Sequence, residues 1–311
     1  MLRHLQRQIP VFTILLGVVA MSVAAPSTPA LSHASSQRVE RQVVPLEIPF
    51  REDERGLMTR VWVNGAGPFL FAIDTGAGVT VVSPKVAAEA GLTAGRAVSI
   101  AGLSGRVTVA HETGQAELAA GDSGNRLPTA SSLTISGGLP ARVDGLLDPA
   151  VALWPLGFEL NFNDGWLRAF DPAFSPVRRD AVPEGGAVTT WLMRGESRRP
   201  FVALGSGSRA LIDTGSTFGF AVDAKAARAF GIEDAGLVKG AAVADIGGGA
   251  VTVRRSRVPR VMLGGMLLEN VPADVLTGVE RGTPILLGRD VLRPFVIAFD
   301  PRSRLIRISL R

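Results

Sequence analysis

Short apolar runs bounded by turn residues dominate the chain from about residue 41 onward. Residues 69–73 form one such run, and the pair Asn64-Gly65 shortly before it is typical of a β-hairpin turn. Runs of this length, separated by Gly, Pro, Asn and Asp, are typical of strands. Residues 84–90 and 224–230 instead follow a capping residue and end at a glycine, which predicts two short helices. The pattern therefore predicts an all-β fold with a few short helices.

The order of these runs repeats in the second half of the chain. An apolar run leads into Asp-Thr-Gly at residues 74–76, and another leads into the same three residues at 213–215. In each half a strand, a short helix, a glycine-rich hairpin tip and a Leu-Leu run follow in that order. The repeat predicts a duplicated unit with two pseudo-twofold-related lobes, residues 41–175 and 187–311, joined by a linker at 176–186.

The repeated motif places one carboxylate at the end of a buried strand in each half. A pseudo-twofold axis between the halves would bring Asp74 and Asp213 together. Two carboxyl groups held close share one proton, because ionising both of them is opposed by their repulsion. The ionised member can accept a proton from water while the protonated member donates one. The sequence therefore makes Asp74 and Asp213 the candidate catalytic residues, with the pair titrating as a unit.

These motifs resemble those of the aspartic protease superfamily, which includes the pepsin-like and retropepsin-like enzymes. The resemblance covers the chain from about residue 41 to its end, and a single chain with both halves is similar to a fused retropepsin dimer. It implies a bilobal acid-protease β-barrel fold and an aspartic endopeptidase that hydrolyses peptide bonds with water activated between Asp74 and Asp213. It also implies supporting residues in the two catalytic loops and substrate-binding residues in two flaps: Thr75, Gly76, Ala77, Thr214, Gly215 and Ser216 in the loops, and Gly102, Leu103, Ser104, Gly105, Ile246, Gly247, Gly248 and Gly249 in the flaps.

The residues around each aspartate have expected roles. The hydroxyls of Thr75 and Thr214 should turn into the opposite loop and lock the two turns together. The glycines that follow let backbone N–H groups approach the carboxylates. Ser216 can donate a hydrogen bond to Asp213, whereas Ala77 cannot do so for its aspartate. Fewer donors to the ionised form mean a less depressed pKa, so we expect a pH optimum less acidic than that of pepsin.

Two departures from the family pattern keep other functions open. Asp148 stands where the family has a glycine after the Leu-Leu run, and its side chain either points outward or makes the first bracing element irregular. The chain has no Tyr, so the flap must act through its backbone. A catalytically inactive peptide-binding or scaffold protein with this fold is the alternative function. A β protein whose two aspartates bind a cation is the third.

The first 34 residues have the order of a secretory signal peptide. Residues 1–8 are basic and contain no acid, residues 9–25 are almost wholly apolar, and small residues follow. An uncleaved membrane anchor over residues 9–25 is the alternative, although the run is short for a span. We expect an exported protein, periplasmic or secreted, that contacts a membrane only if this segment is retained.

The composition of the chain excludes several other kinds of functional site. The chain has no cysteine, which excludes disulfides, thiol nucleophiles and Cys-ligated metals. His111 is the single histidine beyond residue 34, and we expect it to be a polar strand residue. The net charge of +5 comes from dispersed arginines, among them Arg198 and Arg199, which we expect to be solvated, so nucleic-acid binding is not expected. We expect no cofactor, no metal, a monomer, and a protein or peptide as substrate.

Overall fold

A computed structural model describes residues 46–193, 197–232 and 238–310. The predicted signal segment, residues 1–34, lies outside the described residues, so export stays a prediction. Within the described residues no helix is long and apolar enough to cross a membrane. These residues form mostly β-strands, as predicted, with four short helices: α1 (Pro84–Glu89), α2 (Pro149–Ala152), α3 (Ala224–Ala229) and α4 (Arg289–Leu292).

The first half of the chain builds a nine-stranded sheet. The main path of the sheet runs in the order β2-β3-β4-β10-β5-β9-β7-β6, and β8 pairs with β3. Its strands are β2 (Arg51–Asp53), β3 (Gly56–Val63), β4 (Ala66–Ile73), β5 (Val81–Val82), β6 (Ala97–Ala101), β7 (Val107–Ala116), β8 (Leu118–Ala120), β9 (Ser131–Ile135) and β10 (Gly145–Leu147). His111 lies half-buried in β7, the polar strand position that was expected.

The second half builds a seven-stranded sheet with related strand order. The path is β14-β15-β20-β16-β19-β18-β17. Its strands are β14 (Phe201–Ala203), β15 (Arg209–Ile212), β16 (Phe220–Asp223), β17 (Val238–Ala244), β18 (Ala250–Leu263), β19 (Met266–Thr277) and β20 (Ile285–Leu287).

Both halves use the same strand pairing beside the Asp-Thr-Gly motif. In the first half β10 lies parallel to β4 and antiparallel to β5, and Leu147 pairs with Ile73. In the second half β20 lies parallel to β15 and antiparallel to β16, and Leu287 pairs with Ile212. The duplication predicted from the sequence is therefore present in the strand order, and each Leu-Leu run braces the strand that carries an aspartate.

A third sheet contains strands from both halves. Its order is β1-β12-β11-β21-β22-β13, and β11 pairs antiparallel with β21. The predicted linker, residues 176–186, contains no helix or strand and leads from β12 to β13 at the far edge of this sheet. The predicted boundary at residue 175 therefore separates two parts of the chain that both contribute strands to this sheet. Its strands are β1 (Glu47–Pro49), β11 (Gly157–Asn161), β12 (Trp166–Phe170), β13 (Ala187–Thr190), β21 (Phe295–Asp300) and β22 (Leu305–Leu310).

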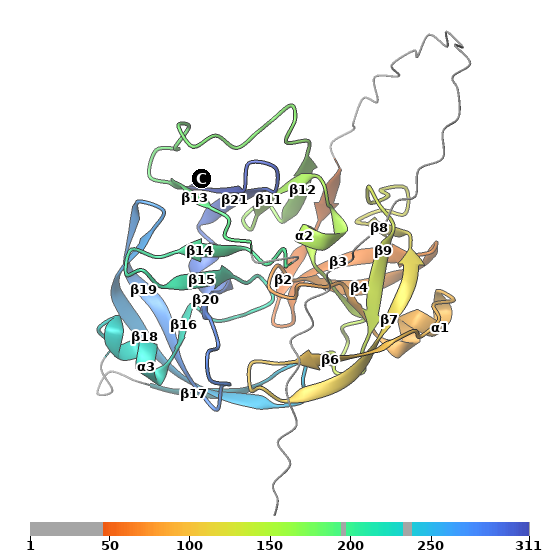
Figure 1. Cartoon of the computed structure of the whole chain (residues 1–311), viewed down its shortest axis with the longest axis horizontal. Helices are drawn as coiled ribbons and strands as arrows, with labels where there is room; N and C mark the ends of the chain where they lie inside the picture. Colours follow the sequence, from red (N-terminus) through yellow and green to blue (C-terminus); the bar gives the residue numbers. More distant parts are fainter. Residues whose placement is uncertain (1–45, 194–196, 233–237, 311) are drawn as a thin grey trace, which may run out of the picture. The chain divides into compact units, whose positions relative to one another are not determined.

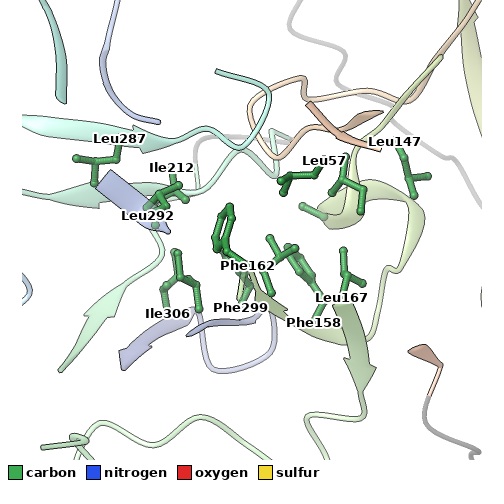
Figure 2. Packing of buried hydrophobic residues seen from close by; sticks show 14 of the residues in the cluster. Leu57, Leu147, Phe158, Phe162, Leu167, Ile212, Leu287, Leu292, Phe299 and Ile306 are labelled. Atoms are coloured by element: carbon green, nitrogen blue, oxygen red, sulfur yellow. The ribbon is translucent and has the colours of Figure 1, made fainter. Parts of the chain in front are cut away.

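One hydrophobic core continues from the first half into the second (Figure 2). Leu57 and Leu147 from the first half and Ile212 and Leu287 from the second belong to the same cluster of buried side chains. Alternating apolar positions on the strands of the shared sheet point into this cluster. Each fully buried side chain of this kind contributes about 1.5–3 kcal/mol. The core thus holds both aspartate-bearing strands on one rigid support.

Candidate active site

Each candidate aspartate follows the last residue of a braced strand. The N–H of Asp74 donates to the carbonyl of Leu147 at 2.9 Å, and the N–H of Asp213 donates to the carbonyl of Leu287 at 2.9 Å. The strand pairing described above is thus extended by one residue in each half, up to the aspartate itself. The carboxyl group of Asp213 lies against Gly76, and that of Asp74 lies against Gly215, so the two carboxyl groups meet between the loops. The structure therefore brings together the two residues predicted from the repeat.

The two threonines cross between the loops as expected. The hydroxyl of Thr75 donates to the carbonyl of Ile212 at 2.7 Å and accepts from the N–H of Thr214 at 3.1 Å. The hydroxyl of Thr214 donates to the carbonyl of Ile73 at 2.9 Å and accepts from the N–H of Thr75 at 3.1 Å. Both side chains are fully buried. These four bonds fix the spacing of the two strand ends, and with it the spacing of the carboxyl groups.

The glycines of the motifs touch the carboxyl groups on two sides. The N–H of Gly76 donates to Oδ1 of Asp74 at 2.8 Å, and the N–H of Gly215 donates to Oδ1 of Asp213 at 3.0 Å. A Cβ atom at Gly76 would lie 2.6 Å from the carboxyl carbon of Asp213, and one at Gly215 would lie 2.6 Å from Oδ1 of Asp74. Each glycine therefore leaves room for the aspartate of the opposite loop.

Comparison with known proteins agrees with this geometry. A family model described as aspartyl protease matches residues 59–147 and 203–291, which together make up more than half of the chain. Each matched segment contains one Asp-Thr-Gly loop and the strand that braces it. The chain belongs to the aspartyl protease family. A search of curated proteins found no match.

In this family member, burial raises the pKa of both aspartates above the ordinary value of 3.8. Burial and the adjacent negative charge of Asp74 raise the pKa of Asp213 to about 8. The positive charge of Arg199 offsets part of the rise for both groups. A pair in this state holds one proton over a broad range around neutral pH, because the first negative charge opposes the second ionisation.

Arg199 was expected to be a solvated charge, and that expectation is wrong. Its side chain is half-buried, and Nη2 donates to the carbonyl of Ala77 in the first catalytic loop at 3.2 Å. Its own carbonyl accepts from Nε1 of Trp191 at 3.1 Å, which anchors the segment before β14 in the core. An Arg-Arg pair in a sequence gives no sign of which member turns inward. Arg198 stacks its guanidinium on the Trp154 ring at 4.0 Å.

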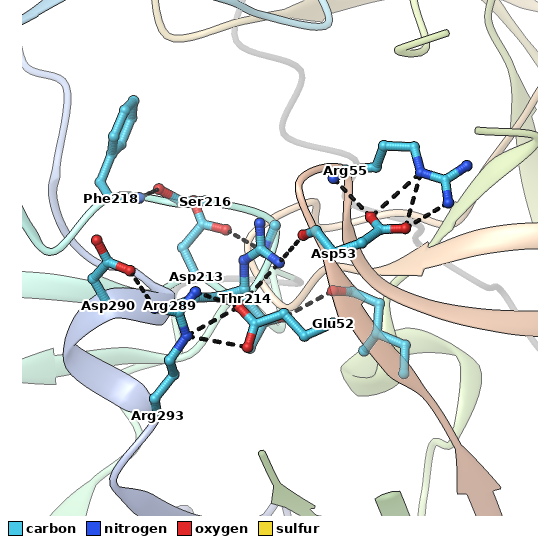
Figure 3. Close-up of polar contacts among 12 residues, drawn as sticks. Glu52, Asp53, Arg55, Asp213, Thr214, Ser216, Phe218, Arg289, Asp290 and Arg293 are labelled. Carbon is cyan, nitrogen blue, oxygen red and sulfur yellow. Dashed lines mark hydrogen bonds and ion pairs between the residues drawn. The ribbon is translucent and has the colours of Figure 1, made fainter. Parts of the chain in front are cut away.

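The expected hydrogen bond from Ser216 to Asp213 is also wrong. The Ser216 hydroxyl accepts from the N–H of Phe218 at 3.2 Å, inside its own loop (Figure 3). The Ser216 hydroxyl thus stabilises the turn after the aspartate instead of bonding to the carboxyl group of Asp213. Ala77, at the corresponding position in the first loop, contributes its carbonyl to Arg199.

A buried ion cluster connects the second catalytic loop to the first half of the chain (Figure 3). Arg289 at the start of α4 is 1% exposed, and its N–H donates to the carbonyl of Ser216 at 3.0 Å. Its Nη1 reaches the carbonyl of Asp53 at 3.1 Å and Oε1 of Glu52 at 3.3 Å. The exposed side chain of Arg293 also pairs with Glu52, at 2.8 Å. These contacts link β2 to α4 beside the loop that follows the second aspartate.

The two glycine-rich tips predicted as flaps meet each other (Figure 1). The tip at 102–105 contacts the tip at 246–249 through Asp245, whose Oδ2 accepts from the N–H of Ser104 at 2.7 Å. The carbonyl of Leu103 accepts from the N–H of Glu280 at 2.9 Å. Asp245 was missed by the sequence argument, although an Asp directly before Ile-Gly-Gly-Gly is a common turn cap. The flap residues lie on the β6–β7 and β17–β18 hairpins, and nothing in the geometry assigns them a substrate.

Raised pKa values of buried acids predict that the protein is less stable at about pH 8 than at about pH 5. The native pKa values of Asp148 and Asp213 are about 7 and about 8, against an ordinary 3.8. Between these limits the native state binds more protons than the unfolded chain, so the free energy of unfolding falls as pH rises. The slope approaches about 1.4 kcal/mol per pH unit for each such group.

Carboxyl groups with lowered pKa values, such as Asp53 and Glu112, lose their protons below this window and do not reverse the slope. Denaturant unfolding curves recorded at intervals between about pH 5 and about pH 8 test the prediction. The midpoint should decline steadily. A midpoint that is constant or rises would contradict the raised pKa values.

Proposed function

We propose that the chain is an aspartic endopeptidase that hydrolyses peptide bonds with a water molecule activated between Asp74 and Asp213. The observation that carries the proposal is the close approach of the two carboxyl groups, which crossing threonines hold at the ends of two symmetric strands. A merely structural pair of buried acids would gain more from neutral side chains, because close like charges are costly. Family membership supports the same chemistry.

The mechanism follows from the charge state of the pair. The ionised carboxylate accepts a proton as water attacks the peptide carbonyl, and the protonated carboxyl donates to the carbonyl oxygen. The pair titrates as a unit, so either aspartate can hold the shared proton at the start. When the tetrahedral intermediate breaks down, the carboxyl group that took a proton from water gives it to the leaving nitrogen, and the carboxylate that protonated the carbonyl oxygen takes a proton back, which restores the starting state of the pair. Both aspartates are half-buried residues.

The substrate is proposed to be an extended peptide that pairs its backbone with the flaps as an added strand. Binding of the peptide would exchange some of the bonds within the flap tips at 102–105 and 246–249, such as the one from the N–H of Ser104 to Asp245, for backbone bonds to the substrate. The predicted signal segment supports a periplasmic or secreted location, where exposed segments of envelope or extracellular proteins are available.

A non-catalytic peptide-binding protein is the second candidate function. Asp148, buried beside the first catalytic loop, is the observation that favours it, because a third acid so close to the pair raises the cost of ionisation. For the third candidate, cation binding, the described residues contain no group of three or more His, Cys, Asp or Glu arranged to hold a metal ion.

A peptide-library digestion distinguishes these functions. The full chain is incubated with a mixture of synthetic peptides at intervals between about pH 4 and about pH 9, and products are read by mass spectrometry. We expect cleavage that peaks between about pH 5 and about pH 7, declines as pH rises through about 8, and is blocked by pepstatin. The decline follows from loss of the shared proton. Binding without cleavage at every pH would favour the scaffold function, and loss of activity with a chelator would favour the cation site.

A further inference from the structure

Asp148 was expected either to point outward or to leave the first bracing element irregular, and its side chain in fact points inward. It is 0% exposed and lies directly after β10. Oδ2 accepts from the N–H of Gly78 in the first catalytic loop at 2.7 Å, and Oδ1 accepts from the N–H of Ala150 at 2.9 Å. Its own N–H donates to the hydroxyl of Thr80 at 3.3 Å. The carboxyl group therefore connects α2 with the loop that carries Asp74.

In the second half, a different pair of residues satisfies the corresponding N–H group of the loop. There the N–H of Phe218 is accepted by the hydroxyl of Ser216, and Gly288 stands at the position of Asp148. A Cβ atom at Gly288 would lie 3.0 Å from that hydroxyl and would overlap the carbonyl of Phe218. The backbone of Phe218 and the hydroxyl of Ser216 together leave no room for a side chain at 288.

The first loop has the opposite arrangement. Ala77 replaces the serine, and the loop is one residue shorter before it joins β5, as the strand register shows. The acceptor oxygen lost from the loop is supplied by Asp148 from the bracing turn. Ala77 with Asp148, and Ser216 with Gly288, are thus two alternative ways to satisfy one N–H group of the loop after the catalytic aspartate.

We propose that Asp148 is a positioning residue of the catalytic pair: its buried carboxyl group holds the first loop through Gly78 and places a third titratable acid beside Asp74. The functional half of this inference rests on the proposed peptidase activity. Two charged groups act on Asp148. The cation is Arg198, which precedes β14, and the anion is Asp74. Burial and the charge of Asp74 raise the pKa of Asp148 to about 7.

The third acid has a consequence for the pH range of the enzyme. As pH rises through about 7, Asp148 becomes negative and opposes loss of the shared proton from the neighbouring pair. The monoprotonated, active state therefore persists to higher pH than it would without Asp148. The second loop also has a buried acid, Asp274, which accepts from the N–H of Gly219 at 2.7 Å but faces Arg255 at 3.5 Å.

The test removes the acceptor oxygen in one variant and only the charge in another. Variants D148G and D148N are compared with the wild-type chain by thermal unfolding and by kcat/KM against a peptide taken from the library digestion. D148G should lower the unfolding midpoint and reduce kcat at about pH 5 by about tenfold or more, because the loop loses its acceptor. D148N keeps an acceptor oxygen for the N–H of Gly78, so it should have a higher midpoint than D148G and keep most of the wild-type kcat at about pH 5.

The pH profile separates positioning from simple stability. In D148N the alkaline limb of kcat/KM should move to lower pH by about one unit, because the third negative charge is gone. An unchanged alkaline limb, or a D148N variant no more stable than D148G, overturns the proposal. If the wild-type chain cleaves nothing, the proposed peptidase function fails, and the unfolding midpoints alone decide whether the carboxyl group of Asp148 holds the first loop.

Discussion

Replacement of either aspartate by asparagine is expected to reduce kcat by about a thousandfold or more while the fold persists. An asparagine at either position can neither accept the proton of the attacking water nor hold the shared proton. Each substitution keeps the size of the side chain and leaves an oxygen for the N–H of Gly76 or Gly215. It also removes an acid whose raised pKa lowers the stability of the native state near neutral pH, so the unfolding midpoint there should stay constant or rise.

The measurement is single-turnover cleavage of a library-derived peptide by D74N, D213N and the wild-type chain. E269Q is the matched control, because Glu269 is exposed on β19 and pairs with Arg260 far from the catalytic motifs in the strand order. The two loss-of-activity variants should bind the peptide with nearly unchanged affinity. Cleavage that survives in either variant would falsify the paired-carboxyl mechanism.

The substitution G215A is expected to have the second-largest effect, a loss of at least a hundredfold in kcat. The added methyl group would lie 2.6 Å from Oδ1 of Asp74 and would drive the two carboxyl groups apart. The buried threonine bonds resist movement of the loops, so the displacement falls on the carboxyl groups themselves. A shift of this kind also removes the hydrogen bond through which the pair shares its proton.

The control for this variant is G114A. Gly114 lies in β7, and a Cβ atom there would meet nothing within 4 Å. We expect this variant to keep wild-type kcat and unfolding midpoint, so that any effect of G215A reflects its position. Wild-type activity in G215A would mean that the two carboxyl groups act at a greater separation than the structure gives them.

The sequence was sufficient to predict the repeat and the meeting of Asp74 and Asp213, because both depend on local patterns. Two apolar strands that each end in Asp-Thr-Gly identify the two carboxyl groups that meet. The close approach of these groups also explains why a glycine must follow each aspartate. The crossing of Thr75 and Thr214 was predicted for the same reason. A buried threonine beside an opposite loop has few partners other than that loop's backbone.

The sequence could not predict which way individual polar side chains turn around the two loops. Asp148 was recognised as unusual, but the direction of its side chain depends on the one-residue difference in length between the two catalytic loops. Ser216 bonds within its own loop because Phe218 presents an N–H there. The inward turn of Arg199 depends on the anchoring of its carbonyl by Trp191. None of these three outcomes has a signal in local propensity or hydrophobic periodicity.

The central claim is that Asp74 and Asp213 hold one proton between them near neutral pH. Carbon-13 NMR of the aspartate carboxyl carbons, followed from about pH 4 to about pH 9 and assigned with D74N, D213N and D148N, measures this state directly. We predict that one carboxyl group of the pair loses its proton only near pH 8, while the pair already carries one negative charge below that value. Two carboxyl groups that both ionise near their ordinary value of 3.8 would contradict the claim.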